Sequence, residues 1–599
     1  MVRLPHYTWR VLPLLFLLAF YWPGLTNWFY QDDFGWLNLA GDVHSFRDLG
    51  PALFAPKAHG NMRPLGDNAF FLIFTSLFGV NALPFHLWIF AVQMASLVLL
   101  GSIVLRLTQS RAAGFWAQIL WIANAGLATL MCWTCVHNQI LSGFFFLLAF
   151  YLLLRHIETG GNSYYIAQWI AFVCGIGALE TNVVYPALAA VYTLFFARSM
   201  LKKILPMFLV SALAVLLHFR FAPPPTSGAY ALHLDARIIT TLWTYWTWAL
   251  GPPRLALVRP TPPWMAALVI AVLTAAALAL VAVQARRRDY IGLFAIAWFV
   301  IVVGPYLPLS EHLTDYYVAV PAIGIAILGA WAIARAWHSR LVWKIAAVLC
   351  LAAYLGASLP AAWAITRWSH ARGERVQDLV LGVAEIHQAQ PAKIILLDGI
   401  DSVLFWSAIV DVPFRVMRIP HVYLTPGSDS QIDAPPGLVT KFILPQGLAV
   451  RALQEDRAVV YRTGGAVLRN VTSHSRSAWK PEQPRFINIG DSVYAEFLGA
   501  GWTESAGGYR AMSGSATLHM GGPRAQGDRL YVGIFNVQQF DIRLRIDGVD
   551  VPATLIRRDY EISEFAAALP RALVGKGTVE VSLSTASRQP LKFGYVEFR

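Results

Sequence analysis

The sequence predicts a multi-pass α-helical membrane protein that continues into a soluble C-terminal region, first of mixed α/β type and then a β-sandwich. Three observations predict this fold class. Of the 599 residues, 57% are hydrophobic and 14% are charged, whereas soluble domains are about 25% charged. Apolar segments of about 20 residues, the length that crosses a bilayer, recur as far as residue 366. Beyond that point the sequence is mixed and polar, and from about residue 480 it alternates with the period of β-strands.

Eleven apolar segments are predicted to be transmembrane helices. They are residues 11–29, 85–105, 112–131, 138–154, 164–180, 183–197, 204–220, 262–283, 290–307, 316–334 and 345–365. With a cytoplasmic N-terminus, the even-numbered connections, which carry clusters of Lys and Arg, all lie inside, as the positive-inside rule requires. The odd-numbered connections and the C-terminal region then face outward. We therefore expect a protein of the plasma (inner) membrane whose C-terminal region is periplasmic or extracellular.

Three domains follow from this pattern. Residues 1–366 form the predicted transmembrane domain, with a long first outer loop at 30–84. Residues 367–479 are the outer-side α/β segment, which opens with the helical pattern "GERVQDLVLGVAEIHQAQ" and the strand pattern "AKIILLDG". Residues 480–599 contain "RLYVGIFNV", "TVEVSLSTA" and other strand patterns separated by turn residues, which predict a β-sandwich module.

Composition and motifs also exclude several function classes. The net charge is +13, but Lys and Arg lie in short connections rather than in patches interleaved with aromatic residues, so nucleic acid is not an expected partner. The four cysteines lie in or beside apolar segments, and no disulfide framework is predicted in the tail. The sequence has no nucleotide-binding glycine pattern, no HExxH motif and no His/Cys cluster with zinc spacing.

The stretch "WFYQDDFGWLNLA" places two adjacent carboxylates, Asp32 and Asp33, directly after the first apolar segment. In a confined site, like charges push one pKa up and leave the other group ionised, so one of the two can act as a base. The alternative is a helix end that is merely exposed at the membrane interface. Further ionisable residues on the predicted outer side favour the functional interpretation.

The other candidate site residues also lie on the predicted outer side. Arg63 and Arg237 are the best phosphate partners, because a guanidinium group matches phosphate oxygens; the alternative for each is interfacial snorkelling or a loop salt bridge. The remaining candidates are Arg220, His86, Glu180, Glu311 and His312. Their alternatives are a packing histidine for His86, a structural acid for Glu180, and a solvated loop for Glu311 and His312.

Taken in order, the motifs "YQDDF", "MRPL", "LPFHLWIFAVQMASLVLL", "LETNVVYP" and "SEHLTDYYVAVPAIG" resemble those of the C-type (GT-C) glycosyltransferases. The resemblance covers roughly residues 10–335 and is strongest to the protein O-mannosyltransferase-like and transmembrane-and-tetratricopeptide O-mannosyltransferase-like branch. It implies a polyprenyl phosphate-linked sugar donor and a catalytic carboxylate at Asp32, with Asp33 beside it, and it implicates Arg63, Glu180 and His312. The chain departs from this pattern in two places. It has "CVHNQI" where members often carry a basic-acidic pair, and its tail has no tetratricopeptide repeats.

The expected activity is that of a membrane glycosyltransferase of hexosyltransferase or mannosyltransferase type. It transfers a sugar, with inversion, from a polyprenyl-phosphate donor to an acceptor hydroxyl of a protein or of an envelope glycan or lipid, on the outer face of the membrane. In this mechanism Asp32 is the general base, Asp33 orients the acceptor or the sugar, and Arg63 with Arg220 or Arg237 stabilises the charge on the phosphate. No cofactor is expected to be obligatory. A divalent metal at the acidic pair is the alternative, and two carboxylates without other clear oxygen ligands give it little support.

Two other function classes compete with this prediction. A transporter or flippase for a lipid-linked glycan would use the outer charges to line a pathway, but these residues gather at one face and inverted repeats with broken helices are not evident. A non-catalytic envelope-glycan assembly protein would depend on residues 480–599 and not on Asp32 and Asp33. Liposome translocation without a glycosidic product would favour the first, and dispensable aspartates the second.

Overall fold

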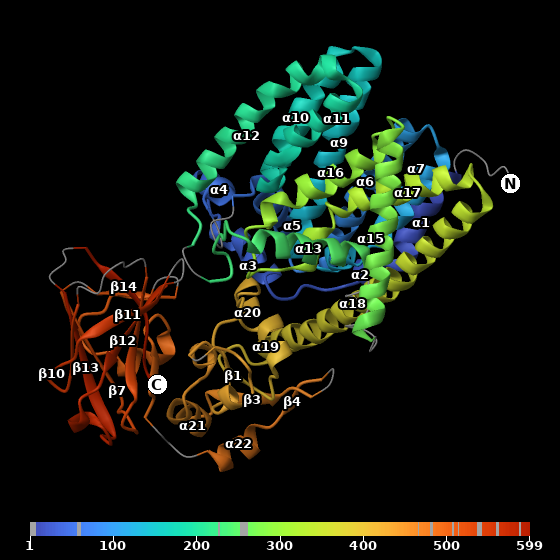
Figure 1. Cartoon of the computed structure of the whole chain (residues 1–599). Helices are drawn as coiled ribbons and strands as arrows, with labels where there is room; N and C mark the ends of the chain where they lie inside the picture. Colours follow the sequence, from blue (N-terminus) through green and yellow to red (C-terminus); the bar gives the residue numbers. More distant parts are fainter. Residues whose placement is uncertain are drawn as a thin grey trace. The chain divides into compact units, whose positions relative to one another are not determined.

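The computed structural model (Figure 1) describes the chain in two compact units, Met1–Glu374 and Arg375–Arg599. The described residues are 8–599 except 57–61, 226–227, 252–261, 436, 465–466, 480–482, 506–507, 513, 536–541, 559–561 and 586–588. The predicted domain boundary at residue 480 lies outside the described residues.

All regular elements among the described residues of the first unit are helices. Five of its described segments are long and apolar enough to cross a membrane, namely α6 (Ala82–Thr108), Thr134–Thr159 with α9 (His137–Thr159), Arg198–Phe221 with α12 (Leu201–Phe221), α15 (Pro263–Arg286) and α18 (Leu341–Ala389). A sixth is the pair α7 (Arg111–Ile122) and α8 (Ala125–Cys132), bent by 66°. The remaining predicted spans correspond to the shorter helices α1 (Thr8–Phe20), α10 (Asn162–Ala178), α11 (Tyr185–Phe196), α16 (Ile291–Val303) and α17 (Ala322–Trp337). The membrane character of the prediction is therefore confirmed, while the count of eleven spans is not.

Two breaks show why apolar length alone overestimates the helices. The first predicted span stops at Phe20, and after Tyr21 the chain continues as the short helix α2 (Trp22–Leu25), with Pro23 in its first turn, where the missing N–H leaves no hydrogen bond unmade. The chain turns at Tyr21, whose hydroxyl donates to the Ile122 carbonyl at 2.8 Å. Between α7 and α8, Asn124 caps the second helix by accepting from the Gly126 amide at 3.0 Å.

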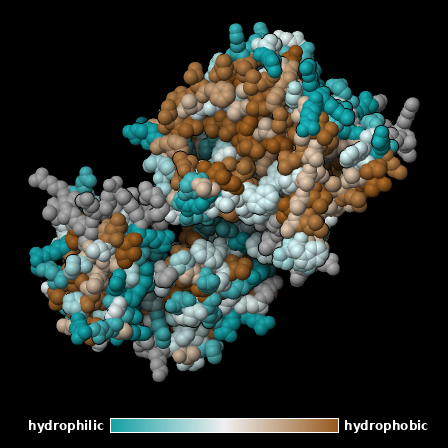
Figure 2. All heavy atoms as spheres, viewed as in Figure 1, coloured by the Kyte–Doolittle hydropathy of each residue, from teal (hydrophilic) through white to brown (hydrophobic). Residues whose placement is uncertain are grey.

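The outward face of the helical unit is apolar. Along α12 the exposed side chains include Leu209 at 74%, Leu216 at 68% and Leu205 at 54% exposure. Figure 2 shows brown, hydrophobic atoms covering this face, with teal atoms gathered near the ends of the helices. An exposed apolar surface of this extent, on helices long enough to span a bilayer, is that of a membrane protein.

The predicted first outer loop contains short helices that pack on the ends of the longer ones. They are α3 (Asp33–Leu37), η1 (Asn38–Asp42), α4 (Phe46–Phe54), η3 (Pro64–Asn68) and α5 (Ala69–Phe78). Gly66 in η3 lies so close to the end of α10 that an added Cβ would be 1.9 Å from the Ala178 carbonyl oxygen. A residue without a side chain is therefore required where this loop meets the bundle.

Helix α18 continues past the predicted domain boundary at 366/367 without interruption. It passes the end of the first apolar segment at Gly373, where an added Cβ would lie 2.1 Å from the Asn27 side-chain oxygen. The segment predicted as a separate helix at the start of the tail is thus the last part of α18. The two units divide within this helix, after Glu374.

The second unit begins with a four-stranded sheet in the order β2-β1-β3-β4. Its strand β1 (Ile394–Asp398) is parallel to β2 (Val422–Leu424) and β3 (Ala458–Arg462), and β3 pairs antiparallel with β4 (Arg469–Asn470). In register, Ile395 lies opposite Val422 and Ile394 opposite Ala458. Helices α19 (Ser402–Ala408) and α21 (Gln446–Gln454) lie in the connections between these parallel strands.

Two antiparallel sheets complete the second unit. One has the order β10-β9-β13-β7 and the other β11-β12-β8-β14-β5, with β6 also paired to β14. The strands are β5 (Phe486–Asn488), β6 (Arg510–Met512), β7 (Ser515–Gly521), β8 (Arg529–Phe535), β9 (Arg543–Ile546), β10 (Val549–Asp550), β11 (Ala553–Arg558), β12 (Ile562–Ala568), β13 (Thr578–Ser584) and β14 (Leu591–Phe598). Buried residues of both sheets, such as Leu518 and Val532, belong to one core. The predicted strand-rich C-terminal region is confirmed.

Candidate functional site

The two adjacent aspartates have different environments. Asp33 is fully buried; one of its oxygens accepts from the Tyr30 amide at 3.0 Å and the other from the Cys135 amide at 2.6 Å. Asp32, the residue before α3, is exposed. The turn that leads into them depends on Gln31, whose φ of 58° lies in the left-handed region that a non-glycine residue seldom adopts. One carboxylate therefore fastens the loop to η4 (Thr134–Val136) and the other faces outward.

Replacing Asp33 should weaken the fold more than replacing Asp32. In Asp33→Asn, an amide NH₂ takes the place of one of the two acceptor oxygens, and a buried backbone N–H loses its partner. We expect a loss of about 1–3 kcal/mol, seen as a lower thermal unfolding midpoint of the full-length protein in mild detergent. Asp32→Asn, at an exposed position, is the matched control and should unfold at the wild-type temperature. Equal midpoints for the two variants would contradict the structural role of Asp33.

A cation that the sequence analysis missed, Arg372 of α18, lies beside the aspartates. One of its nitrogens donates to the Gln31 side-chain oxygen at 2.9 Å, and its guanidinium carbon lies 4.9 Å from the centre of the Tyr30 ring. Its charge also interacts with those of Asp32 and Asp33. The available signal was an arginine one turn after Trp368 in "RWSHARGER", but only the close passage of α18 at Gly373 shows what it approaches.

Arg63 forms a second charged group at the site. Its Nε and one terminal nitrogen donate to the two oxygens of Glu180 at 2.8 and 2.7 Å, and its other terminal nitrogen donates to Asp67 at 3.4 Å. Burial raises the pKa of Asp67 to about 6, although the charge of Arg63 and a hydrogen bond from Asn138 act against this rise. The structure therefore brings together two residues predicted for the site, Arg63 and Glu180, as a bidentate ion pair, and it adds Asp67.

The "CVHNQI" segment, which departs from the family pattern, supports this group. His137 contacts the Gly66 carbonyl through Nδ1 at 3.1 Å, and its Nε2 accepts from the Trp88 indole at 3.0 Å. The proton of His137 is thus on Nδ1. Asn138 donates to Asp67 at 2.8 Å. The segment holds the loop of residues 63–68 against the bundle.

Aromatic side chains connect these charged groups. Tyr30 stacks on Trp133 with ring centres 5.9 Å apart, and Trp133 meets the edge of Tyr316 at 6.1 Å. Tyr230 lies over His312 at 4.3 Å. Burial raises the pKa of Tyr230, which also interacts with the charges of Asp32 and Arg63. Tyr230 therefore contacts one predicted residue, His312, and lies within electrostatic range of two others, Asp32 and Arg63.

Other predicted residues lie in different surroundings. Arg237 donates to both oxygens of Asp235 at 3.0 Å and to Glu311 at 3.3 Å, and His233 contacts the same Glu311 oxygen at 3.3 Å. This is an exposed cluster in which Arg237 and Glu311, two of the predicted residues, pair with each other. The last two predicted residues lie outside both the Arg63 group and the Arg237 cluster. Arg220 is exposed in the last turn of α12, and His86 is fully buried in α6.

The described residues contain no group of three or more His, Cys, Asp or Glu side chains arranged to hold a metal ion. The charge of Asp32 instead interacts with Arg372 and with the aromatic residues Tyr230 and Tyr316. In chemical terms, the arrangement offers one accessible carboxylate, a cation near it, and flat apolar surfaces.

Comparison with known proteins gives matches only among solved structures. No protein-family model matches the chain, and no curated protein matches it in sequence. The chain is similar to ArnT of Cupriavidus metallidurans bound to undecaprenyl phosphate, at 11% identity over 95% of this chain and 100% of that one, with a TM-score of 0.39. It is also similar to the apo oligosaccharyltransferase of Archaeoglobus fulgidus, at 10% identity over 100% of this chain and 97% of that one, with a TM-score of 0.43. The arabinosyltransferase EmbB of Mycobacterium smegmatis matches at 10% identity over 100% of this chain and 65% of that one, with a TM-score of 0.28. At these identities and TM-scores, the likeness identifies neither a family nor a function.

Proposed function

We propose that this chain is a GT-C-type membrane glycosyltransferase that transfers a sugar from a polyprenyl-phosphate donor to an acceptor hydroxyl. The observation that carries the proposal is that two adjacent carboxylates differ in burial and in hydrogen bonding. Asp33 is locked by two backbone amides, while Asp32 is exposed with the charge of Arg372 close by. An accessible carboxylate held in place by a buried neighbour suits a general base.

The reaction needs no protein nucleophile, because the lipid phosphate is itself the leaving group. Asp32 accepts the proton of the acceptor hydroxyl while that oxygen forms the new bond to the anomeric carbon. The bond from this carbon to the phosphate oxygen breaks on the opposite face, so the configuration inverts. The sequence predicts that Asp33 orients the acceptor or the sugar; from its two backbone partners we propose that it does so by positioning the loop that carries Asp32.

Cations must stabilise the charge that develops on the departing phosphate. Arg372 is the best placed of them, since its guanidinium is held by Gln31 and Tyr30 next to the aspartates. The guanidinium of Arg63 donates to both oxygens of Glu180. We therefore propose that Arg63 supports the structure of the site and contributes positive charge near it, without binding the phosphate directly. Arg220 and Arg237 are proposed as secondary contacts of the donor phosphate, and His312 as a neighbour of the substrate beside Tyr230.

The partners of this function are the donor lipid, the surrounding membrane lipids, and a protein or an envelope glycan or lipid as acceptor. The loop with Asp32 and the C-terminal unit are proposed to face outward from the plasma membrane, as the charge of the connecting segments predicts. No metal is proposed as obligatory.

Mass spectrometry of envelope glycans and glycoproteins, from cells with and without the chain, tests the proposed function. The expected result is one class of hexose-modified molecule that disappears with the chain and returns with the wild type but not with Asp32→Asn. Full return with Asp32→Asn, together with loss on removal of the β-sheet module, would instead indicate an assembly protein.

A further inference from the structure

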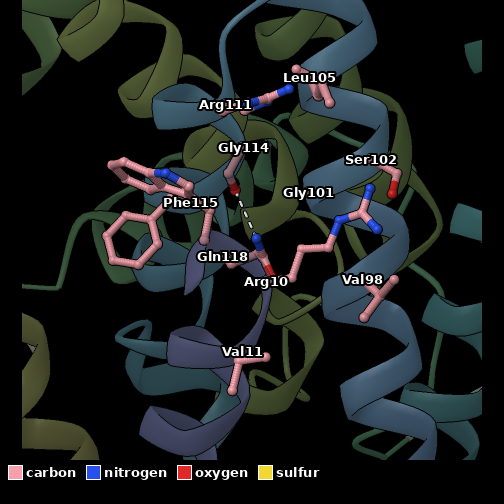
Figure 3. Close-up of a pocket in the computed structure, with 11 residues that line it drawn as sticks. Arg10, Val11, Val98, Gly101, Ser102, Leu105, Arg111, Gly114, Phe115 and Gln118 are labelled. Atoms are coloured by element: carbon pink, nitrogen blue, oxygen red, sulfur yellow. Dashed lines mark hydrogen bonds between the residues drawn. The ribbon is translucent and has the colours of Figure 1, made fainter. Parts of the chain in front are cut away.

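A cavity lies between α1, α6 and α7, at the opposite end of α6 from its first turn. Its volume is about 520 Å³. Figure 3 shows the residues that line it, which are Trp9, Arg10, Val11, Val98, Gly101, Ser102, Leu105, Arg111, Gly114, Phe115 and Gln118. Arg10 belongs to the first turn of α1. Asp32 comes after the C-terminal end of α1 and after α2, and so lies toward the other end of this helix. The cavity is therefore distinct from the candidate active site.

The polar lining of this cavity includes one buried group with unused capacity. Gln118 is only 3% exposed; its amide nitrogen donates to the Gly114 carbonyl at 3.0 Å, as the dashed line in Figure 3 marks. Its side-chain oxygen has no hydrogen-bond partner among the described residues. Buried oxygens are nearly always hydrogen-bonded, so this one calls for a donor from a ligand or from water.

Gly101 and Gly114 hold Gln118 in this position. An added Cβ at Gly101 would lie 2.5 Å from the Gln118 amide nitrogen, and one at Gly114 would lie 2.8 Å from the Gly101 carbonyl oxygen. The two helices thus approach closely at their glycines, and the Gln118 amide fills the space that a side chain at Gly101 would need. Gln118 is also one of the residues that line the cavity.

Charge and apolar surface meet around the Gln118 side-chain oxygen. Two arginines enter the opening from different helices, and Figure 3 shows Arg10 reaching from α1 toward Gly101 and Ser102 of α6. Val11, Val98 and Phe115 supply the apolar lining, and Trp9 packs against Phe115 with ring centres 5.3 Å apart. Guanidinium groups suit a phosphate, the Gln118 oxygen suits a hydroxyl, and the apolar residues suit an acyl chain.

We propose that this cavity binds an anionic glycerophospholipid whose headgroup carries a hydroxyl, such as phosphatidylglycerol. The lipid phosphate lies between Arg10 and Arg111, the headgroup hydroxyl donates to the Gln118 oxygen, and an acyl chain follows Val11 and Val98. In the orientation proposed above, on which this step rests, this end of the helices lies at the cytoplasmic leaflet. The site would thus fasten α1, which leads into the Asp32 loop, to a lipid of the opposite leaflet.

Native mass spectrometry of the full-length protein in mild detergent tests this site. Phosphatidylglycerol and phosphatidylcholine with the same acyl chains are titrated, and phosphatidylglycerol should bind preferentially. Arg10→Gln should weaken its binding by roughly tenfold, the effect of losing one charge-assisted hydrogen bond. Arg287→Gln removes an equal charge from an exposed position outside the cavity and should have no effect.

A second variant addresses the headgroup. Gln118→Leu should weaken phosphatidylglycerol binding while leaving that of phosphatidic acid, which has no headgroup hydroxyl, unchanged. Equal binding of phosphatidylglycerol and phosphatidylcholine, or equal losses in Arg10→Gln and Arg287→Gln, would overturn the proposal. Binding of water-soluble glycerol phosphate as strong as that of the lipid would show a free-phosphate site instead and would overturn it as well.

Discussion

Asp32→Asn is expected to lower kcat for sugar transfer by a factor of about 10²–10⁴, the range that a positioned general base contributes. The amide has nearly the shape of the carboxylate but cannot accept the hydroxyl proton. KM for the donor should change little, because the phosphate is bound by cations. Initial rates of polyprenyl phosphate release by purified protein in liposomes, at saturating acceptor, measure this effect.

The control for this experiment is an unchanged thermal midpoint, since Asp32 is exposed and Asp33 retains both of its amide partners. A wild-type kcat in Asp32→Asn would remove Asp32 as the base. A more active acceptor with a lower hydroxyl pKa should recover part of the lost rate, because it depends less on a base.

Arg63→Met is expected to have the largest effect on stability. It leaves Glu180 and Asp67 without their cation, and removing one partner of a buried ion pair costs about 3–5 kcal/mol. We expect about 3 kcal/mol, at the low end of this range, because the Glu180 side chain is 28% exposed. Arg237→Met is the matched control: its pair with Glu311 is 45% and 52% exposed, and exposed pairs contribute only about 0–1 kcal/mol.

The Arg63→Met deficit should also depend on pH. Arg63 lowers the pKa of Asp67, which burial has raised to about 6, so its removal moves that pKa higher. When the pKa of a carboxyl group is higher in the folded than in the unfolded state, the free energy of unfolding falls as the pH rises from the unfolded-state pKa to the folded-state pKa. Unfolding midpoints should therefore differ more from wild type at pH 8 than at pH 5. A deficit equal to that of Arg237→Met would show that the Arg63 network does not stabilise the fold.

Some helices could be predicted well because local signals define them. The span predicted at 85–105 is α6, Ala82–Thr108, which begins where the Asn81 side chain accepts from the Leu83 amide and ends at Gln109 in the left-handed region. The breaks at Tyr21 and Asn124 were harder to predict. Each lies inside an apolar run and donates a hydrogen bond to a group distant in sequence. Tyr21 donates to the Ile122 carbonyl, and Asn124 donates to the Tyr354 hydroxyl.

The site was only partly predictable for the same reason. The sequence indicates that two acids follow an apolar segment, but not that Asp33 is the buried one, because this depends on the Gln31 turn and on Cys135, 102 residues away. Arg63 and Glu180 were both selected as charges on the predicted outer side; their pairing across 117 residues comes from packing. Arg372 lies 341 residues from the Gln31 that it contacts, and no periodicity connects the two.

Following the donor itself shows whether the chain transfers a sugar from a lipid phosphate with Asp32 as the base. Purified protein in liposomes is given a polyprenyl-phosphate hexose and an acceptor, and the lipid products and the glycosidic linkage are analysed by mass spectrometry and NMR. We expect release of polyprenyl phosphate only when acceptor is present, with inverted anomeric configuration in the product and loss of both in Asp32→Asn. Movement of intact donor across the bilayer without any cleaved lipid would contradict this expectation.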